Sequence, residues 1–322
     1  MHIPDGFINA RTALATGVIA AGGLGTALVN VRRNLPPSRV PLIGLASALV
    51  FAAQMLNFPV AGGTSGHLIG ATLAAVLLGP SPAIVVMSAV LILQCFMFAD
   101  GGVTALGANI FNMALVAPTV GYGIYSLIRR IAGVGLRSQL FATAFACWCS
   151  TVAASIACAG QLALSGTVAW AAAFPAMTAV HMLIGVGEAL STTLVVAAVA
   201  RIRPELLLSE SRPTSRPRYG ELTAYGLLVC LGLAAFVAPF ACGWPDGLER
   251  VAAVLGFEHK AASPALFISS LSDYAVPGIR SAVLSTAIAA CAGTVFAFVL
   301  AYFLARFLTP RRRSSSDSRG ER

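Results

Sequence analysis

Uncharged apolar stretches long enough to cross a lipid bilayer recur along the whole chain. Residues 40–99 contain no Asp, Glu, Lys or Arg, and a transmembrane helix needs only about 20 predominantly apolar residues. Across all 322 residues, 57% are hydrophobic and 10% are charged, which lies outside the usual range of water-soluble domains. The sequence therefore predicts an all-α polytopic membrane protein with little room for a separate soluble domain.

We expect nine membrane-spanning helices. Punctuation at Asn57-Phe58-Pro59 and at Gly79-Pro80-Ser81-Pro82 divides the uncharged region into three passes. The third pass is short, so we expect its outer end to be irregular and packed inside the protein, where bare backbone is tolerated. The nine expected spans cover residues 12–29, 40–58, 65–79, 82–99, 103–127, 140–164, 171–200, 222–241 and 281–305.

The basic residues lie almost entirely on one side of this predicted bundle. All but four of the 21 lysines and arginines fall there, the exceptions being Arg11, Arg250, Lys260 and Arg280. By the positive-inside rule that side is the cytoplasm, so we expect the N-terminus outside the cell membrane and the C-terminus in the cytoplasm. This membrane topology accounts for the formal charge of +9. We therefore expect the lipid bilayer as a partner and no nucleic acid.

The amino terminus itself is a candidate metal ligand. The α-amine of Met1, the amide nitrogen of His2 and the Nδ1 atom of its imidazole can close two fused rings around one ion. An amide nitrogen gives up its proton only to a strongly polarising ion, and three in-plane nitrogens favour Ni(II) or Cu(II) over zinc or magnesium. No basic region precedes the first apolar run and no convincing cleavage site follows it, so we expect the terminus to be retained.

A second candidate is the glycine-rich segment GGTSGH at residues 62–67, at the predicted outer mouth of the third span. Glycines adopt positive φ angles and let backbone approach closely. This segment could wrap the inserted N-terminus while His67 supplies a fourth nitrogen. A single membrane histidine is more often structural, but two of the chain's four histidines on one predicted face favour a shared site.

Three motifs together resemble the substrate-binding membrane component, of the CbiM/NikM type, of energy-coupling-factor transporters for cobalt and nickel. They are MHIPDGF at 1–7, GGTSGHLIG at 62–70 and HMLIGVGE at 181–188. The resemblance implies a seven-helix substrate-binding bundle with its N-terminus inserted from outside, and an ion bound by Met1, His2 and His67. It also implies separate ATP-binding cassette ATPases and a transmembrane coupling subunit as partners. Ni2+ or Co2+ is then the transported substrate, and we expect no organic cofactor.

The rest of the chain resembles the small two-span companion subunit of the same transporters. The resemblance rests on PDGLE at 245–249, although Arg250 stands where that family commonly has an aromatic residue, so we assign the motif no detailed role. Joining the two subunits in one chain raises their effective concentration. The expected organisation is a metal-binding part at 1–203, a cytoplasmic linker at 204–220, a two-span companion domain at 221–309 with an extracytoplasmic loop at 243–280, and a basic cytoplasmic tail at 310–322.

Five further polar residues are supporting candidates. His181 and Glu188 share one face of the seventh span; they are either a structural pair that joins helices or a support for the metal ligands, since a buried carboxylate needs a partner. Asn109 and Asn112 share a face of the fifth span, where they could bond the inserted segment or a liganding imidazole, or join helices. Ser65 lies beside His67.

The leading hypothesis is a non-catalytic recognition subunit that captures Ni2+ or Co2+ from outside for ATP-driven uptake. No GxxxxGK[ST] phosphate loop occurs in the chain, and four in-plane nitrogens favour nickel over cobalt. A stand-alone ion-coupled permease would need several membrane-embedded carboxylates, whereas we place only Glu188 inside a span. A membrane enzyme with His67 and His181 as heme or metal ligands is disfavoured because we expect the two residues at different depths.

Overall fold

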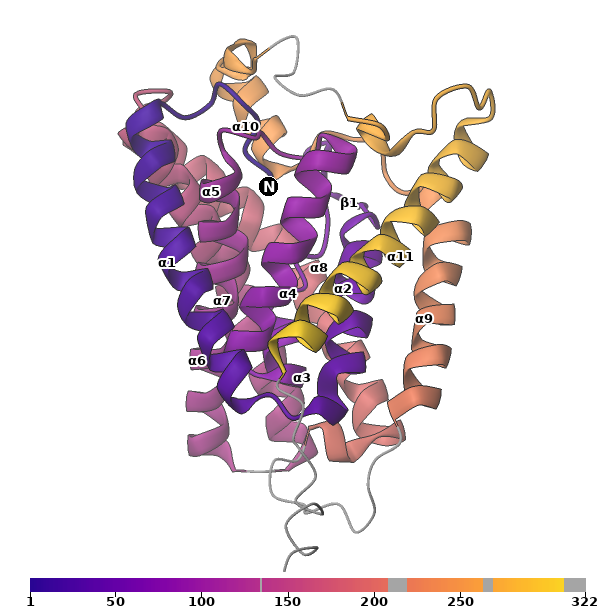
Figure 1. Ribbon diagram of the computed structural model, residues 1–322. Helices are drawn as coiled ribbons and strands as arrows, with labels where there is room; N and C mark the ends of the chain where they lie inside the picture. The colour runs from indigo at the N-terminus through magenta and orange to yellow at the C-terminus, as the bar shows by residue number, and fades with distance from the viewer. Residues whose placement is uncertain (134, 208–218, 263–268, 310–322) are drawn as a thin grey trace, which may run out of the picture.

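The computed structural model describes residues 1–133, 135–207, 219–262 and 269–309, whose helices stand side by side in a bundle (Figure 1). Within these ranges the only strands are β1 (Phe58–Val60) and β2 (Thr64–Gly66), which form one antiparallel hairpin. The prediction of an all-α fold is confirmed. The α-helices are α1 (Ala10–Asn34), α2 (Val40–Gln54), α3 (Ala71–Leu78), α4 (Pro80–Leu93), α5 (Leu106–Asn109), α6 (Ala117–Ala132), α7 (Leu136–Leu164), α8 (Trp170–Ile202), α9 (Tyr219–Phe236), α10 (Gly247–Leu255) and α11 (Ala282–Leu308).

Seven helical segments in the described residues are long and apolar enough to cross a membrane, so the chain is a multi-pass membrane protein. Two of them continue through π-helical turns, Gln94–Phe98 after α4 and Ile110–Val116 between α5 and α6. The other two expected spans contain shorter helices, α2 with 15 residues and α3 with eight. Hydropathy alone does not separate a short helix buried among its neighbours from a full span. The seven long segments are Ala10–Asn34, Pro80–Phe98, Leu106–Ala132, Leu136–Leu164, Trp170–Ile202, Tyr219–Phe240 and Ala282–Leu308.

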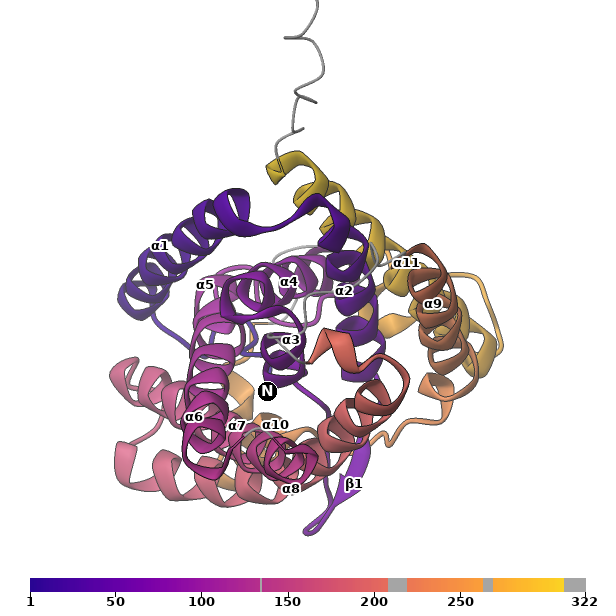
Figure 2. The same ribbon diagram turned by 90° about the horizontal axis from the view of Figure 1, so that it is seen from below.

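The third expected span is half irregular, as the glycines predicted. Strand β2 is followed by residues 67–70, which form no regular element, and then by α3. Gly70 begins that helix with a φ of 76°, and every residue from 65 to 70 is buried. Seen from below, α3 lies inside the ring of the other helices (Figure 2). The segment that carries His67 is therefore enclosed by the bundle.

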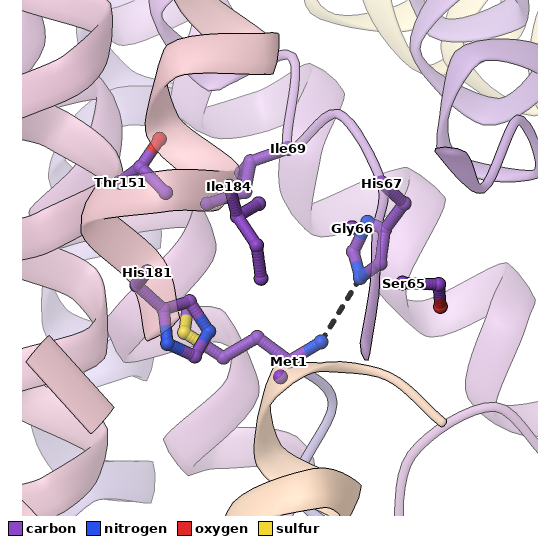
Figure 3. Close-up of a pocket in the computed structure, with 9 residues that line it drawn as sticks. Met1, Ser65, Gly66, His67, Ile69, Thr151, His181 and Ile184 are labelled. Atoms are coloured by element: carbon purple, nitrogen blue, oxygen red, sulfur yellow. Dashed lines mark hydrogen bonds between the residues drawn. The ribbon is translucent and has the colours of Figure 1, made fainter. Parts of the chain in front are cut away.

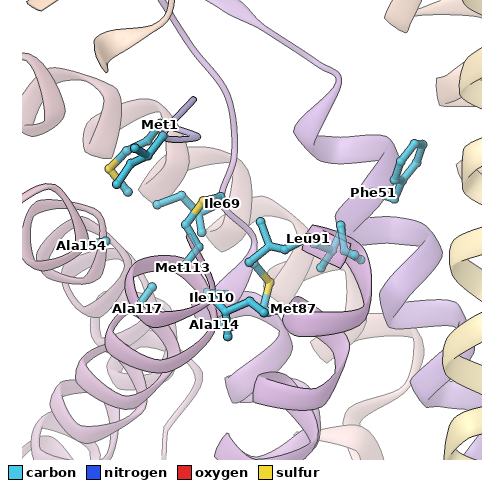
Figure 4. Packing of buried hydrophobic residues seen from close by; sticks show 14 of the residues in the cluster. Met1, Phe51, Ile69, Met87, Leu91, Ile110, Met113, Ala114, Ala117 and Ala154 are labelled. Atoms are coloured by element: carbon cyan, nitrogen blue, oxygen red, sulfur yellow. The ribbon is translucent and has the colours of Figure 1, made fainter. Parts of the chain in front are cut away.

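The amino-terminal residues belong to the main apolar core. Met1 and Ile3 are 3% and 0% exposed, and they join the same cluster of buried side chains as Ile69, Met87 and Met113 (Figure 4). Fully burying an isoleucine side chain contributes about 2 kcal/mol. Apolar packing therefore helps to hold the terminus in the bundle.

The two C-terminal membrane helices, α9 and α11, pack against α2. Close approach is possible because small residues lie at the contacts. A Cβ atom on Gly293 of α11 would lie 2.1 Å from the ring of Phe51, and one on Gly44 of α2 would lie 3.0 Å from the ring of Phe298. In the chain, α10 comes between α9 and α11, but it lies apart from them, at the same end of the bundle as the N-terminus (Figure 1).

Candidate metal site

The first residues enter the bundle as an extended segment whose backbone is hydrogen-bonded to neighbouring residues. Asn109 bonds Ile3 in both directions: its Oδ1 accepts from the Ile3 amide at 2.8 Å and its Nδ2 donates to the Ile3 carbonyl at 3.1 Å. The amide of Gly102 donates to the same carbonyl at 2.8 Å. These bonds fix the register of the segment and carry the Met1 amine into the protein interior.

Asp5 and Gly6 turn the chain back out toward α1. The Asp5 carboxylate accepts hydrogen bonds from the Thr104 amide at 2.8 Å and from the Thr104 hydroxyl at 2.5 Å, while its carbonyl accepts from the Ala262 amide at 2.8 Å. Gly6 has a φ of 93°, and a Cβ atom there would lie 2.2 Å from the carbonyl oxygen of Lys260. Only glycine satisfies both conditions.

The Met1 amine lies beside the imidazole of His67. Its nitrogen is 2.9 Å from Nε2 of His67, and both residues are buried (Figure 3). For metal–nitrogen bonds of about 2.0 Å, adjacent corners of a square plane are about 2.8 Å apart. Nδ1 of His67 is 3.2 Å from the Leu68 carbonyl, which favours a proton on Nδ1 and leaves Nε2 free to bind an ion.

His2 completes the cluster of nitrogen donors. Its ring stacks on that of His67 with centroids 5.6 Å apart and planes 14° apart. Nδ1 of His2 lies 3.0 Å from Oδ1 of Asp100, and the Tyr274 hydroxyl donates to Oδ2 of that carboxylate at 2.5 Å. Among the described residues, Nε2 of His2 is buried without a hydrogen-bond partner. Closing the chelate would therefore exchange Asp100 for the ion at Nδ1.

A carboxylate from the C-terminal part also contacts the amine. Oδ2 of Asp246 forms an ion pair with the Met1 nitrogen, while Oδ1 caps α10 by accepting from the amides of Leu248 and Glu249 at 2.8 and 2.9 Å. Burial alone would lower the pKa of the Met1 amine, but the charge and hydrogen bond of Asp246 raise it above the usual value of an α-amine. Burial would raise the pKa of Asp246, yet the amine lowers it well below its usual range.

Sequence reasoning did not identify Asp100 or Asp246. Asp246 lies in the PDGLE motif, which was visible but had no assigned role, and Asp100 lies in a short loop where no spacing marks a ligand. In the described part of the chain, no group of three or more His, Cys, Asp or Glu residues is arranged to hold a metal. A site built on an amine and a backbone amide does not appear in a count of side-chain ligands.

Two of the supporting candidates contact other parts of the protein. Ser65 joins the hairpin to the C-terminal part, because its amide donates to the Pro245 carbonyl at 2.8 Å and its hydroxyl to the Trp244 carbonyl at 2.7 Å. Asn112 pairs with Gln161 of α7 through two hydrogen bonds of 2.9 and 2.8 Å. Asn112 therefore joins helices, whereas Asn109 bonds the inserted segment.

His181 and Glu188 have separate partners. His181 bonds the Met177 carbonyl through Nδ1 at 2.8 Å and lines a cavity of about 10 Å³ together with Met1 and His67 (Figure 3). Glu188 accepts from the Gly70 amide at 2.9 Å. The expectation that His67 and His181 lie apart is wrong, since both line one cavity. That cavity holds about one water molecule, so a porphyrin does not fit between them.

The fold and this site define a class: a polytopic helical membrane protein that buries its own amino terminus next to a histidine of an internal loop. The chain belongs to the cobalt uptake substrate-specific transmembrane region family (CbiM), whose model matches residues 2–206. A second family model, the PDGLE domain, matches residues 220–310. The resemblance drawn from the sequence motifs is confirmed.

Several relatives share nearly the full length. The chain is 34% identical to a putative fused nickel transport protein NikMN of Archaeoglobus fulgidus, over 95% of this chain and 99% of that protein. It is 32% identical to a fused nickel transport protein NikMN of Rhodobacter capsulatus, over 91% and 94%. A crystal structure of a truncated transition metal transporter is 35% identical, with a TM-score of 0.57 over 62% of this chain and 99% of that one. The family is thus one of transmembrane metal-transport proteins.

Proposed function

We propose that this protein is the metal-recognition subunit of an energy-coupling-factor ABC transporter and captures Ni2+ or Co2+ for ATP-driven uptake. It is non-catalytic, and separate ATPases and a transmembrane coupling subunit supply the energy. The observation that carries this proposal is the distance of 2.9 Å between the buried Met1 amine and Nε2 of His67. The names of the fused nickel transport relatives support it.

The proposed ligands are four nitrogens in one plane: the amine of Met1, the amide and Nδ1 of His2, and Nε2 of His67. In such a plane the amine and Nε2 occupy adjacent corners, which agrees with their separation. Four in-plane nitrogens and the general affinity order both favour Ni(II) over Co(II). We therefore propose nickel as the preferred substrate, with His2 turning from Asp100 to bind it.

We further propose that the site faces outward, with the N-terminus outside and the C-terminus in the cytoplasm. Basic residues end four long helices, at Arg33 of α1, Arg130 of α6, Arg201 of α8 and Arg306 of α11. Figure 1 shows these helix ends on the side of the bundle away from the N-terminus. Under the positive-inside rule this distribution supports a cytoplasmic location for that side.

The proposed domains keep the boundaries expected from the sequence. Residues 1–203 bind the metal and residues 221–309 form the companion domain, whose Asp246 contacts the Met1 amine. Most of the proposed linker, residues 208–218, lies outside the described residues, as do residues 263–268 of the outer loop and the tail at 310–322. The alternative, an ion-coupled permease, would need membrane-embedded carboxylates for coupling. Glu188 is the carboxylate that we placed inside a span, and both of its oxygens accept hydrogen bonds from the protein itself. It therefore gives this alternative no support.

The decisive experiment compares the native protein with a variant that carries one additional alanine before Met1. We expect the native form to hold one equivalent of Ni2+ and the extended form to lose at least about 100-fold in affinity, because the amine moves by about 3.5 Å. A variant with one additional alanine after Arg322 is the matched control. Competitive titration measures both affinities, and equal binding by all three forms would exclude the amino-terminal chelate.

A further inference from the structure

Helix α8 packs against the segment that carries His67, residues 64–70. His181, Ile184 and Glu188 follow one another at helical spacing on its buried face. A Cβ atom on Gly66 would lie 2.9 Å from Ile184, and one on Gly187 would lie 2.4 Å from the ring of Phe58. The hairpin therefore lies directly against α8, and glycines on both sides make this contact possible.

Glu188 uses both of its carboxylate oxygens at this contact. Oε1 accepts from the Gly70 amide at 2.9 Å, and Oε2 accepts from the Thr151 hydroxyl of α7 at 2.7 Å. The Glu188 side chain is buried, at 2% exposure. A buried acceptor with two good donors fixes the groups that it bonds.

The bond to Gly70 replaces a missing helix cap. Gly70 is the N-cap residue of α3 and has no side chain to bond the first free amides. An acceptor oxygen from another helix at this position satisfies one of the free amides at the start of α3. On the opposite side, Nε2 of Gln54 donates to the Ile69 carbonyl at 2.8 Å. Residues 67–70 are thus held between α2 and α8.

We propose that Glu188 is a positioning residue for His67. By fixing Gly70, three residues further along the chain, it keeps Nε2 of His67 next to the Met1 amine. The inference rests on the proposed function, since it concerns the same metal site. Ligand groups must be held to within about 0.5 Å of the productive geometry. Among the hydrogen bonds of the described chain, Glu188 and Gln54 are the side chains from neighbouring helices that bond the backbone of residues 67–70.

The test asks whether the effect of Glu188 on Ni2+ affinity requires His67. Glu188→Ala, and the apolar Glu188→Met as a second variant that fills the space, should each lower the Ni2+ affinity about 10- to 100-fold. Glu188→Gln should bind within about threefold of the native protein, because its amide oxygen accepts from Gly70 and its NH2 donates to Thr151. In a His67→Ala background, Glu188→Ala should cause no further loss, since its effect passes through His67.

Thr193→Val is the matched control. It removes a hydroxyl from the same helix that has no hydrogen-bond partner in the described chain, and it should leave the affinity unchanged. Equal losses from Glu188→Ala in the native and the His67→Ala backgrounds would overturn the positioning role, as would native affinity in both Glu188→Ala and Glu188→Met. Native protein that holds no Ni2+ would instead overturn the proposed function itself, which separates the two failures.

Discussion

At the scale of single residues, the Met1 amine is shared between His67 and Asp246. The ion pair with Asp246 raises the amine pKa, but a metal needs the lone pair of a neutral amine. An ion bound at the proposed site would therefore displace a proton from the amine and a second proton from the His2 amide. The proposed chelate thus couples metal binding to proton release.

This coupling predicts that Ni2+ binding strengthens as pH rises. Below the raised amine pKa two protons leave for each ion bound, so the association constant should increase about 100-fold per pH unit, and above it about tenfold. Competitive titration between about pH 6.5 and about pH 9.5 spans the usual amine pKa. A constant affinity over this range would contradict ligation by the amine and the amide.

Replacing Asp246 by Asn should destabilise the protein without metal. Asparagine still caps α10, but the buried ammonium group of Met1 loses its charged partner, which costs about 2 kcal/mol. Because the folded-state pKa of the amine is raised, this contribution is complete below about pH 8 and is lost as pH rises through the folded pKa. The difference in melting temperature between native protein and variant should therefore shrink at alkaline pH.

Glu249→Gln is the control for this charge change. Glu249 is the other acid of the same capping box, and its carboxylate accepts from the Asp246 amide at 2.9 Å rather than from Met1. We expect a much smaller change in melting temperature for Glu249→Gln than for Asp246→Asn. Equal effects would mean that the helix cap, and not the ion pair with Met1, accounts for the stability.

At the scale of elements, the inserted N-terminal segment depends on the loop before α5. A Cβ atom on Gly102 would lie 2.3 Å from the Asp5 amide nitrogen and 2.4 Å from Oδ1 of Asp5. Backbone cannot yield there, so Gly102→Ala should displace the segment and lower Ni2+ affinity at least about tenfold. Gly22→Ala on α1, where nothing lies within 4 Å, should bind normally. Unchanged affinity in Gly102→Ala would show that the contact between Gly102 and Asp5 is not needed to position the proposed metal ligands.

The same elements show what local sequence predicts. Glycine punctuation indicated the short third pass with an irregular outer end, because glycine and proline restrict secondary structure locally. Asn109 and Asn112 were equal candidates because they share one face of the fifth span, and only the structure shows that Asn109 bonds the inserted segment while Asn112 bonds Gln161. The contact of Met1 with Asp246, 245 residues away, depends on how the C-terminal helices pack, and no spacing in the sequence encodes it. Nor did hydropathy reveal that α2 is a helix of only 15 residues inside the bundle.

At the scale of the whole molecule, the N-terminal and C-terminal parts contact each other in two places, at one end of the bundle and along its membrane helices. Near the end of the bundle that holds the N-terminus, Asp246 and Pro245 contact Met1 and Ser65. Within the membrane, α9 and α11 pack on α2, where small residues allow close helix contact. The covalent connection should therefore raise the local concentration of one part for the other without being needed to hold them together.

We predict that a chain cut between residues 208 and 218 remains one complex in detergent. The two fragments should purify together through a tag on either one, because α11 packs closely on α2 at Gly293 and Phe51, where a Cβ atom would lie 2.1 Å from the ring. Gly293→Val should separate the fragments by forcing these helices apart. Gly232→Val on α9, where nothing lies within 4 Å, should not. Fragments that separate without any substitution would show that the connecting segment, and not helix packing, holds the companion part beside the metal site.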